Sequence, residues 1–454
     1  MNDASGTFET SETPVLIPNE AYVSQDYAKS EGERLWPKVW QIACREEELA
    51  KVGDFVVYDI LDDSIIVTRS APDQISAYFN VCQHRGRRLA DGCGHARAFT
   101  CRFHGWSWNL DGKCQYILDP EDWNDTLDDE NTRLPPVRVG RWGGWVWINM
   151  DPEAESLEDY LGEAKTLLDP FEIDQLRFKW RQWLYFPCNW KTALEAFNES
   201  YHVQTSHPQL MRWVNYRHWS RAAGKHGHHG VLAPRDGAHE QGGSGLSGVN
   251  VRGEDDPRIA VAEQFEEMAR TLDATTPQTI LEAANRLVDE LPEGTGPAEV
   301  GAHLMKSAMR DDAARGVIWP EITHDQMHAA GFDWHLFPNF IVLPGPTFAL
   351  CYRARPNGHD PDSCIFEVCA LERYPKGEEP ETAWVFEPDP TEEKWRLILS
   401  QDFSNMPEVQ RGMKSRGFKG ARPNPREEAV IANFHRVLAQ YMGTGEPMPL
   451  SRSE

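Results

Sequence analysis

Residues 82–104 read CQHRGRRLADGCGHARAFTCRFH and contain three cysteines and three histidines. A structural disulfide does not require histidines, and hydrophobic packing requires neither residue type. Cysteine and histidine in close spacing are the usual ligands of zinc and of iron–sulfur clusters. The stretch therefore predicts a metal centre, and the chain around it has to fold so that several of these side chains converge on one point.

Two sets of four ligands fit this stretch. The first set consists of Cys82, His84, Cys101 and His104, which gives a C-x-H pair, sixteen intervening residues and a C-x-x-H pair. The second set begins with Cys93 and His95 and leaves only five residues before the next cysteine. Sixteen residues allow a strand and a turn between two ligand loops, whereas five barely allow the chain to leave one loop and enter another. We therefore predict the first set as the ligands and assign Cys93 and His95 to a hairpin.

The residues around the first set suit a cluster held by two loops. Strand-like segments lead into both loops, at 77–81 and 99–100. Gly86 and Gly105 each follow a ligand histidine closely, where a backbone without a side chain lets N–H groups approach bound sulfur. Two cysteines and two histidines also suit zinc. The residues by themselves leave the choice between zinc and iron open.

The chain has 454 residues, nine cysteines and a formal net charge of −25, with a pI of about 5.1. This length gives room for two or three domains. The negative charge argues against nucleic acid or an anionic membrane as partner, and no apolar run approaches the ~18 residues of a membrane span. The polar start, MNDASGTFETSETP, is unlike a secretion signal. We therefore expect a cytoplasmic protein whose cysteines are thiols or metal ligands.

The sequence predicts three parts. Residues 1–34 form a flexible polar tail, residues 35–160 form a small antiparallel β domain, and residues 161–454 form a second domain. Alternating segments at 54–60, 64–69, 75–81 and 145–148 predict strands of the β domain. Strands near 178–186, 340–352 and 364–374, with helices between them, indicate an α+β layout for the second domain.

Residues 221–330 look like an insertion into the second domain. Their first part is rich in glycine and histidine and is predicted to be a mobile loop. Helices are predicted after it, near 257–273, 278–291 and 298–314. His226, His228 and His229 lie in the loop, and no cysteine or carboxylate completes a metal site there. We therefore expect these three histidines to be solvated.

A second motif lies at residues 189–208, NWKTALEAFNESYHVQTSHP. On one helix, Glu195, Glu199 and His202 would occupy positions i, i+4 and i+7, which share a face. His207 would lie roughly 140° further around the helix. Both imidazoles can therefore reach one metal only if the helix bends or ends between them; otherwise they are ordinary histidines of an amphipathic helix. Two histidines and one carboxylate leave coordination positions open on an iron, as oxygen activation requires.

Both motifs resemble those of one family. The pattern C-x-H-R-G … C-x-x-H-G-W resembles the Rieske [2Fe–2S] domain, in which two histidines replace two cysteines on one iron. The residues after the ligand histidines, RGRR and GWSW, lack the additional cysteines of respiratory-chain Rieske proteins. The pattern NWK-x-x-x-E-x-x-x-E-x-Y-H-x-x-x-x-H resembles the catalytic domain of Rieske non-haem iron oxygenases. From about residue 35 to 443, apart from the insertion, the chain is similar to the large (alpha) subunit of the aromatic-ring-hydroxylating dioxygenase family.

The resemblance implies the site residues. The [2Fe–2S] cluster is bound by Cys82, His84, Cys101 and His104. A mononuclear Fe(II) is bound by His202 and His207, with Asp402 from the stretch LSQDFSNMPEVQRGMK as third ligand, although an aspartate there can also cap a helix. Glu199 stands where the family usually has aspartate. It is implied to link the two metal centres across a subunit boundary, between His104 of one subunit and His202 of its neighbour.

The resemblance also implies fold and function. The second domain is expected to wrap an antiparallel sheet around helices, as in helix-grip (START-like) folds. The expected function is that of a terminal oxygenase, which uses O2 and electrons from NAD(P)H, delivered by a reductase and/or ferredoxin, to mono- or dihydroxylate an aromatic or other hydrophobic substrate. The expected assembly is a homotrimer or an α3β3 complex with a small β subunit. The alternatives are a monooxygenase or demethylase of a methylated amine, ether or quaternary ammonium compound, and a pure Rieske electron carrier.

Overall fold

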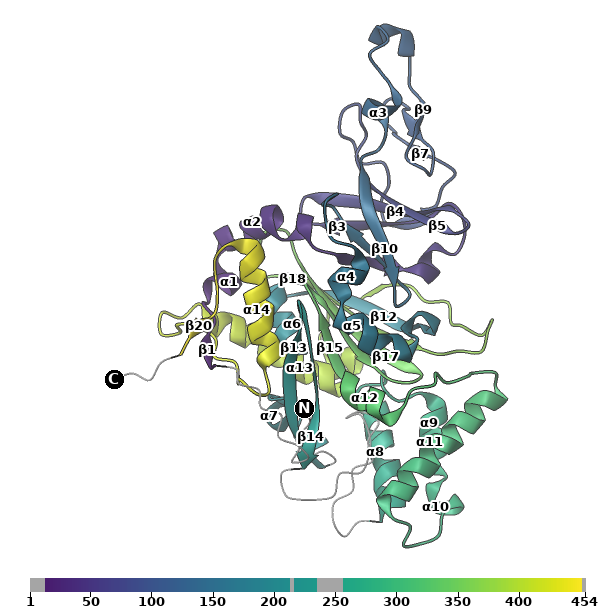
Figure 1. Ribbon diagram of the computed structural model, residues 1–454, viewed down its shortest axis with the longest axis vertical. Coiled ribbons are helices and arrows are strands. Elements are labelled where there is room, and N and C mark those ends of the chain that lie inside the picture. The colour runs from purple at the N-terminus through teal and green to yellow at the C-terminus, as the bar shows by residue number, and fades with distance from the viewer. Residues whose placement is uncertain (1–12, 213–215, 235–255, 451–454) are drawn as a thin grey trace. The chain divides into compact units, whose positions relative to one another are not determined.

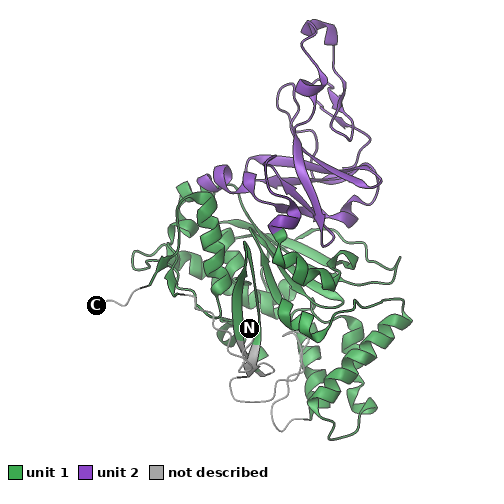
Figure 2. Ribbon diagram, viewed as in Figure 1, with its two compact units in different colours: residues 1–28, 161–454 green, residues 29–160 purple. Residues whose placement is uncertain are grey.

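The computed structural model describes residues 13–212, 216–234 and 256–450. The chain forms two compact units, each with its own sheet (Figure 2). One unit is Lys29–Tyr160, and the other consists of Met1–Ala28 together with Leu161–Glu454. Each unit is described by itself below.

The unit Lys29–Tyr160 is built from antiparallel strands. Its seven-stranded sheet has the order β2 (Gln41–Arg45), β11 (Trp145–Asn149), β10 (Pro136–Trp142), β5 (Gln74–Phe79), β4 (Asp63–Ala71), β3 (Asp54–Ile60) and β6 (Cys93–His95). A second sheet consists of β7 (Phe99–Thr100), β8 (Ser107–Trp108) and β9 (Cys114–Tyr116). The predicted strands of the β domain are confirmed, because alternating apolar residues such as Ile65, Val67 and Ala77 fill its interior.

The other unit is organised around an eight-stranded sheet. The strand order is β13 (Tyr216–Ala223), β14 (His226–Pro234), β15 (Asp333–Leu336), β16 (Phe340–Pro344), β17 (Phe348–Pro356), β18 (Cys364–Glu372), β12 (Arg177–Phe186) and β19 (Val385–Phe386). All neighbours are antiparallel except β12 and β19. The predicted strands at 178–186 and 364–374 are confirmed as β12 and β18. The segment predicted as one strand at 340–352 is a hairpin of two strands, β16 and β17, which turns at Gly345.

Helices pack on this sheet and beside it (Figure 1). The helices of this unit are α1 (Glu20–Val23), α5 (Glu163–Leu168), α6 (Trp190–Glu195), α7 (Val203–Ser206), α12 (His324–Ala330), α13 (Glu392–Met413) and α14 (Ala429–Met442). Helix α2 (Gln25–Arg34) begins in this unit and has most of its residues in the other. Helix α6 packs on β17 and β18, and α14 packs on β13 and β14. The antiparallel sheet that holds helices in this way gives the unit the expected α+β architecture. The β unit carries two short helices, α3 (Asp129–Thr132) and α4 (Leu157–Leu161).

Four further helices form a satellite with its own apolar core. They are α8 (Pro257–Thr271), α9 (Gln278–Asn285), α10 (Leu287–Glu290) and α11 (Pro297–Ala314), close to the ranges predicted from periodicity. Phe265, Ile280, Leu287 and Leu304 are among the buried residues that hold them together. This part of the chain is therefore a helical subdomain.

The prediction that residues 221–330 begin with a mobile, solvated loop is wrong. Residues 226–234 form β14, where His226, His228 and His229 are 1–2 % exposed. The neighbouring glycines are needed for close packing, since a Cβ on Gly227 would lie 2.8 Å from Val430 and one on Gly230 would lie 2.4 Å from the Trp219 ring. A composition rich in glycine and histidine predicts flexibility, but here the histidine rings pack in the interior, where His228 stacks on Trp334. Residues 235–255 of this prediction lie outside the described part of the chain.

The prediction of a flexible tail over residues 1–34 is also wrong for the residues that the structure describes. Val15–Leu16 forms β1, which pairs with β20 (Met448–Pro449), and two helices follow. Tyr22 on α1 has no exposed surface. Its hydroxyl lies 2.9 Å from both carboxylate oxygens of Glu195 and 2.8 Å from Nε2 of His435. One buried tyrosine thus anchors a segment whose polar composition predicts disorder.

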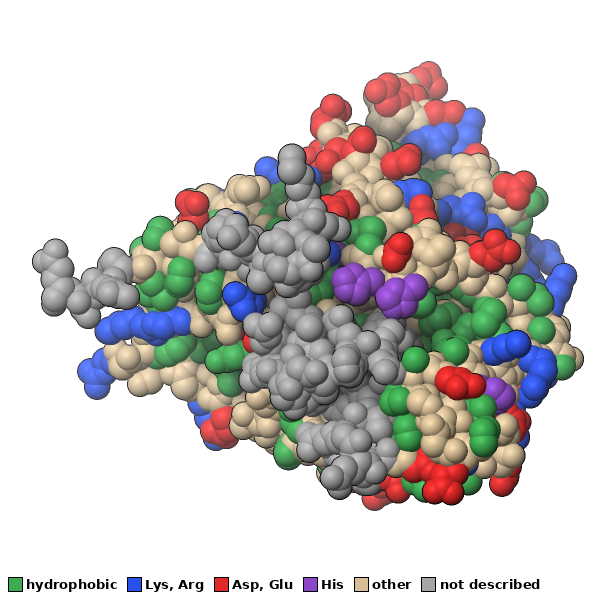
Figure 3. Space-filling view, turned by 60° about the horizontal axis from the view of Figure 1, so that its bottom comes forward, with side chains coloured by type: hydrophobic (Ala, Val, Ile, Leu, Met, Phe, Trp, Pro, Cys, Tyr) green, Lys and Arg blue, Asp and Glu red, His purple; other side chains and the backbone are tan. Residues whose placement is uncertain are grey.

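The surface carries charges of both signs. On the face drawn in Figure 3, Asp and Glu side chains lie among Lys and Arg side chains rather than in one continuous patch. No helix in the described residues is both long and apolar enough to span a lipid bilayer.

Candidate metal centres

Two loops of the β unit have the same backbone geometry. The N–H of Gly86 donates to the carbonyl of Cys82 and that of Cys82 donates to Arg87, at 2.9 and 2.8 Å. In the second loop, Gly105 donates to Cys101 and Cys101 donates to Trp106, at 3.0 and 2.8 Å. Both glycines have positive φ, +75° and +77°, a conformation that disfavours other residues. Each loop therefore presents its cysteine in the same way.

The four predicted cluster ligands come together. The sulfur of Cys82 accepts backbone N–H bonds from the second and third residues after it, and so does that of Cys101. The rings of His84 and His104 lie 4.6 Å apart between centroids. The Nδ1 atoms of both are buried and have no hydrogen-bond partner in the described structure. Two sulfurs that accept N–H bonds and two unused imidazole nitrogens fit a [2Fe–2S] cluster.

Cys93 and His95 do not join this group. They lie on the exposed strand β6, where Nδ1 of His95 is 2.9 Å from the carboxylate of Asp54. The sequence-based choice of Cys82 and His84 as the first ligand pair agrees with this placement.

The second motif does not form one long helix. Helix α6 ends at Glu195, and the N–H groups of Phe197 and Asn198 bond three residues back, to Leu194 and Glu195. The prediction that Glu195, Glu199 and His202 share a helix face is therefore wrong. Glu195 turns toward Tyr22 and His435 instead. In the described residues, only the short helix α7 lies between His202 and His207. The two rings can therefore point at one metal, which they could not do on one long helix.

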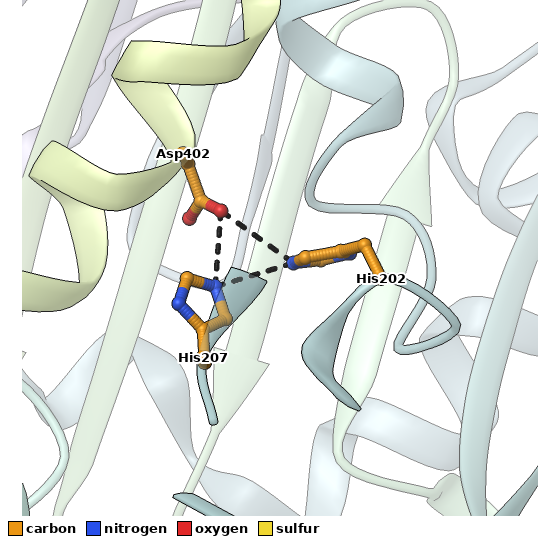
Figure 4. A group of neighbouring side chains, drawn as sticks. All are labelled: His202, His207 and Asp402. Carbon is orange, nitrogen blue, oxygen red and sulfur yellow. Dashed lines mark hydrogen bonds and ion pairs between the residues drawn. The ribbon is translucent and has the colours of Figure 1, made fainter. Parts of the chain in front are cut away.

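His202 and His207 flank α7, and Asp402 approaches them from the middle of α13 (Figure 4). The Nε2 atoms of the two histidines are 3.3 Å apart, and Oδ1 of Asp402 lies 3.0 Å from His207 and 3.5 Å from His202. A metal about 2.1 Å from two ligands at right angles separates those ligands by about 3.0 Å. The three atoms thus fit one face of an octahedral metal. Because Asp402 is inside α13, it does not cap the helix.

Each histidine is oriented through its other nitrogen. Nδ1 of His202 is 2.6 Å from Oε1 of Glu199, whose other oxygen accepts the backbone N–H of His202 at 3.0 Å. Nδ1 of His207 is 2.8 Å from Oε1 of Gln401. Such partners fix the ring and leave Nε2 for the metal. Burial lowers the pKa of His202, but Glu199 and Asp402 outweigh it and raise this pKa to about 9, so a metal has to displace a proton there.

Gln401 was missed by the sequence reasoning, although it directly precedes the predicted ligand Asp402. Nothing in the sequence pairs it with His207, which is 194 residues away. Tyr22 and His435, which hold Glu195, were missed for the same reason.

An aromatic wall lies next to the triad. The ring of Tyr352 on β17 stacks on Phe197 at 4.2 Å, and Phe197 stacks on Phe366 at 5.4 Å. Phe403, the neighbour of Asp402 on α13, contacts Phe366 edge to face. The negative charge of Asp402 acts on Tyr352, which places this ring near the metal ligands. The site therefore combines a metal-binding face with apolar, polarisable surroundings.

Comparisons with known proteins agree with this arrangement. Residues 39–125 match the Rieske [2Fe-2S] domain, and residues 157–444 match the ring hydroxylating alpha subunit (catalytic domain). The carnitine monooxygenase oxygenase subunit of Escherichia coli (strain K12) is 34% identical over 45% of this chain and 55% of its own length. The anthranilate 1,2-dioxygenase large subunit of Acinetobacter baylyi is 32% identical over 46% of this chain and 45% of its own length. The chain thus spans about half the length of the curated relatives it matches.

Solved structures share the fold over nearly the whole chain. A quaternary ammonium Rieske monooxygenase in complex with gamma-butyrobetaine has a TM-score of 0.62 and 21% identity, and covers 97% of this chain and 100% of its own. Naphthalene 1,2-dioxygenase from Rhodococcus sp. has a TM-score of 0.63 and 19% identity, over 94% of each chain. Since the family model of the catalytic domain alone covers well over half of the residues, the chain belongs to the ring hydroxylating alpha subunit family, with a Rieske [2Fe-2S] domain preceding the catalytic domain.

Proposed function

We propose that this protein is the terminal component of a Rieske oxygenase. The observation that carries the proposal is the triad of His202, His207 and Asp402, whose three ligand atoms lie within 4.8 Å of one another in a chain that also carries a Rieske ligand set. A pure electron carrier needs only the Rieske set. A triad that occupies one face of a metal leaves the opposite face for O2 and substrate.

The residues divide the work. When bound, the [2Fe–2S] cluster supplies single electrons and the mononuclear iron supplies a site for oxygen activation. His84 and His104 would hold the cluster through Nδ1, which leaves each Nε2 to carry a proton outward. Glu199 accepts a hydrogen bond from Nδ1–H of His202 and so fixes the orientation of the ring. Gln401 does the same for His207, and the aromatic wall around Tyr352 keeps water from the reacting face.

We propose that electrons reach the cluster from NAD(P)H through a separate reductase, with or without a ferredoxin. In the assembly, Glu199 would accept a hydrogen bond from His104 of a neighbouring copy as well as from His202. This arrangement requires a closed ring of subunits, for which we propose a trimer, alone or with a small β subunit. The carboxylate can take this second donor, because each of its oxygens accepts only one bond from His202 and keeps a further lone pair.

Two substrate classes are compatible with the site. The aromatic wall supports an aromatic or other hydrophobic substrate that is mono- or dihydroxylated. The second candidate is a monooxygenase or demethylase of a methylated amine or quaternary ammonium compound. It is favoured by the sequence similarity to a carnitine monooxygenase subunit. It is also favoured by Glu199, because this residue departs from the aspartate that is usual in the ring-hydroxylating family.

The test is to purify the protein and reconstitute it anaerobically with iron and sulfide. The proposal predicts about three irons and two acid-labile sulfides per chain, and oxygen consumption that depends on a substrate and a reductant. Product analysis with labelled O2 then separates insertion of one oxygen atom from insertion of two. A protein that retains zinc and no iron, or a cluster without the mononuclear iron, would refute the proposal.

A further inference from the structure

A buried carboxylate outside the metal triad has an incomplete set of partners. Asp333 begins strand β15 and is 5 % exposed. Its Oδ1 is buried without a hydrogen-bond partner in the described structure, and its Oδ2 lies 3.6 Å from Nε2 of His229. Buried polar atoms are nearly always hydrogen-bonded, so this carboxylate oxygen can take a partner from outside the described residues.

Asp333 lies near the segment that carries His202. It lies opposite His229 in the register of β14 and β15, and Nε2 of His229 is 3.1 Å from Oγ of Ser200. Ser200 directly follows Glu199, in the segment that leads to His202. The charges of Glu199 and Asp333 act on each other, and Tyr352 is within reach of the charges of both Asp333 and Asp402. Asp333 therefore shares the surroundings of the triad and of the aromatic wall.

No cation from the described residues pairs with this carboxylate. Burial and the charge of Glu199 raise the pKa of Asp333 well above its ordinary value, and only the backbone N–H of Trp334 acts in the opposite direction. His229 does not serve as the counterion, because burial lowers its pKa well below the usual range and keeps the ring neutral. A positively charged ligand would satisfy the carboxylate and restore its ionised form.

The surrounding rings suit an organic cation. The register places Tyr352 on the same face of the sheet as Asp333, and its ring packs against that of Phe197; aromatic rings attract alkylated ammonium groups. His202 of the triad is 24% exposed, so the site opens to solvent. The chain carries a net charge of −25, which favours the approach of cations.

We propose that the substrate of the mononuclear iron site carries a positively charged amine or quaternary ammonium group, with Asp333 as its counterion and Tyr352 and Phe197 as its aromatic contacts. This inference rests on the proposed oxygenase function and names the substrate class for the same site. It selects the second of the two candidate classes. Asp333 acts here as a binding residue and takes no part in holding the metal.

The test measures binding to the reconstituted protein without reductant, so that no turnover is needed. The probes are two matched pairs, choline with 3,3-dimethylbutan-1-ol and phenyltrimethylammonium with tert-butylbenzene, whose members differ in charge and hardly in shape. In at least one pair the charged probe should bind at least about tenfold more tightly. Asp333→Asn should abolish this preference and leave the affinity for the neutral probe unchanged. Asp325→Asn on the exposed face of α12 is the control for overall charge and should keep the preference.

Equal affinities within both pairs for the unmodified protein would overturn the inference, and so would a preference that survives in Asp333→Asn. If Asp333→Asn does not fold, Tyr352→Leu removes an aromatic face, and the preference should fall by several-fold. The proposed oxygenase function fails on a different measurement, the iron and sulfide content. Absence of iron with the charge preference intact would refute the oxygenase function and leave the cation site standing. Iron and sulfide at the expected content without a charge preference would refute the cation site and leave the oxygenase function standing.

Discussion

Glu199 holds His202 with both carboxylate oxygens, one 2.6 Å from the ring Nδ1 and the other 3.0 Å from the backbone nitrogen. The side chain of Glu199 thus bonds both the ring and the backbone of the histidine three positions later. This contact fixes which ring nitrogen is left for the metal.

Glu199→Gln should keep both metals bound and slow electron transfer between the centres by roughly 10–100-fold, because the amide keeps the shape and loses the charge. The rate is measured as oxidation of the reduced cluster in a single turnover with substrate and O2. Glu408→Gln, at an exposed position of α13, is the matched control. Transfer at the parent rate in Glu199→Gln would show that the carboxylate does not connect the centres.

The choice of cluster ligands is tested by removing one histidine from each candidate pair. His84→Ala should lose the cluster, because its buried Nδ1 faces no other partner in the described structure. His95→Ala should keep it, because this exposed ring only contacts Asp54. Visible absorption and iron content show whether each of the two variants retains the cluster. Loss of the cluster in His95→Ala would support the ligand set that begins at Cys93.

Gln401→Leu should weaken iron binding at the triad by roughly 10–100-fold, since His207 would lose the partner that orients its ring. The affinity is measured by competition with a chelator, with the cluster absorption as internal reference. Ser404→Ala is the control on the same helix. The hydroxyl of Ser404 donates to a backbone carbonyl, so its removal should leave the affinity for iron unchanged. An unchanged affinity in Gln401→Leu would mean that His207 needs no support from α13.

The buried pair of arginines on β17 provides a test of pH dependence. Burial raises the pKa of Glu367, but Arg353 and Arg355 outweigh it and lower this pKa from 4.5 to about 2. The carboxylate therefore contributes stability above pH 4.5, and this contribution is lost as the pH falls toward 2. Glu367→Gln should lower the free energy of unfolding by about 3–5 kcal/mol at pH 7, because the buried Arg353 and the largely buried Arg355 lose the charge of this carboxylate.

The deficit of Glu367→Gln should be constant from pH 7 to about 5 and shrink at lower pH. Urea unfolding monitored by tryptophan fluorescence measures it. Asp59→Asn breaks a pair with Arg88 whose side chains are about half exposed, and should cost at most about 1 kcal/mol. A deficit that grows as the pH falls would contradict the assigned ionisation of Glu367.

Local residue patterns alone predict the two motifs and the type of each unit. Spacing was sufficient for Cys82 and His84, because only two well-separated loops can present four ligands to one cluster. Period-two alternation was sufficient for the strands of the β unit, since each strand buries one face. Helical periodicity located the satellite helices within a few residues.

The remaining features depend on how distant segments pack together. His226, His228 and His229 are buried because aromatic rings and glycines from distant strands accommodate them, which no local composition reveals. Asp402 and Gln401 come within hydrogen-bonding distance of His207 only because α13 brings them there. The unpaired oxygen of Asp333 has no signature in the sequence, because the shortage of partners around an atom depends on every element that packs against it.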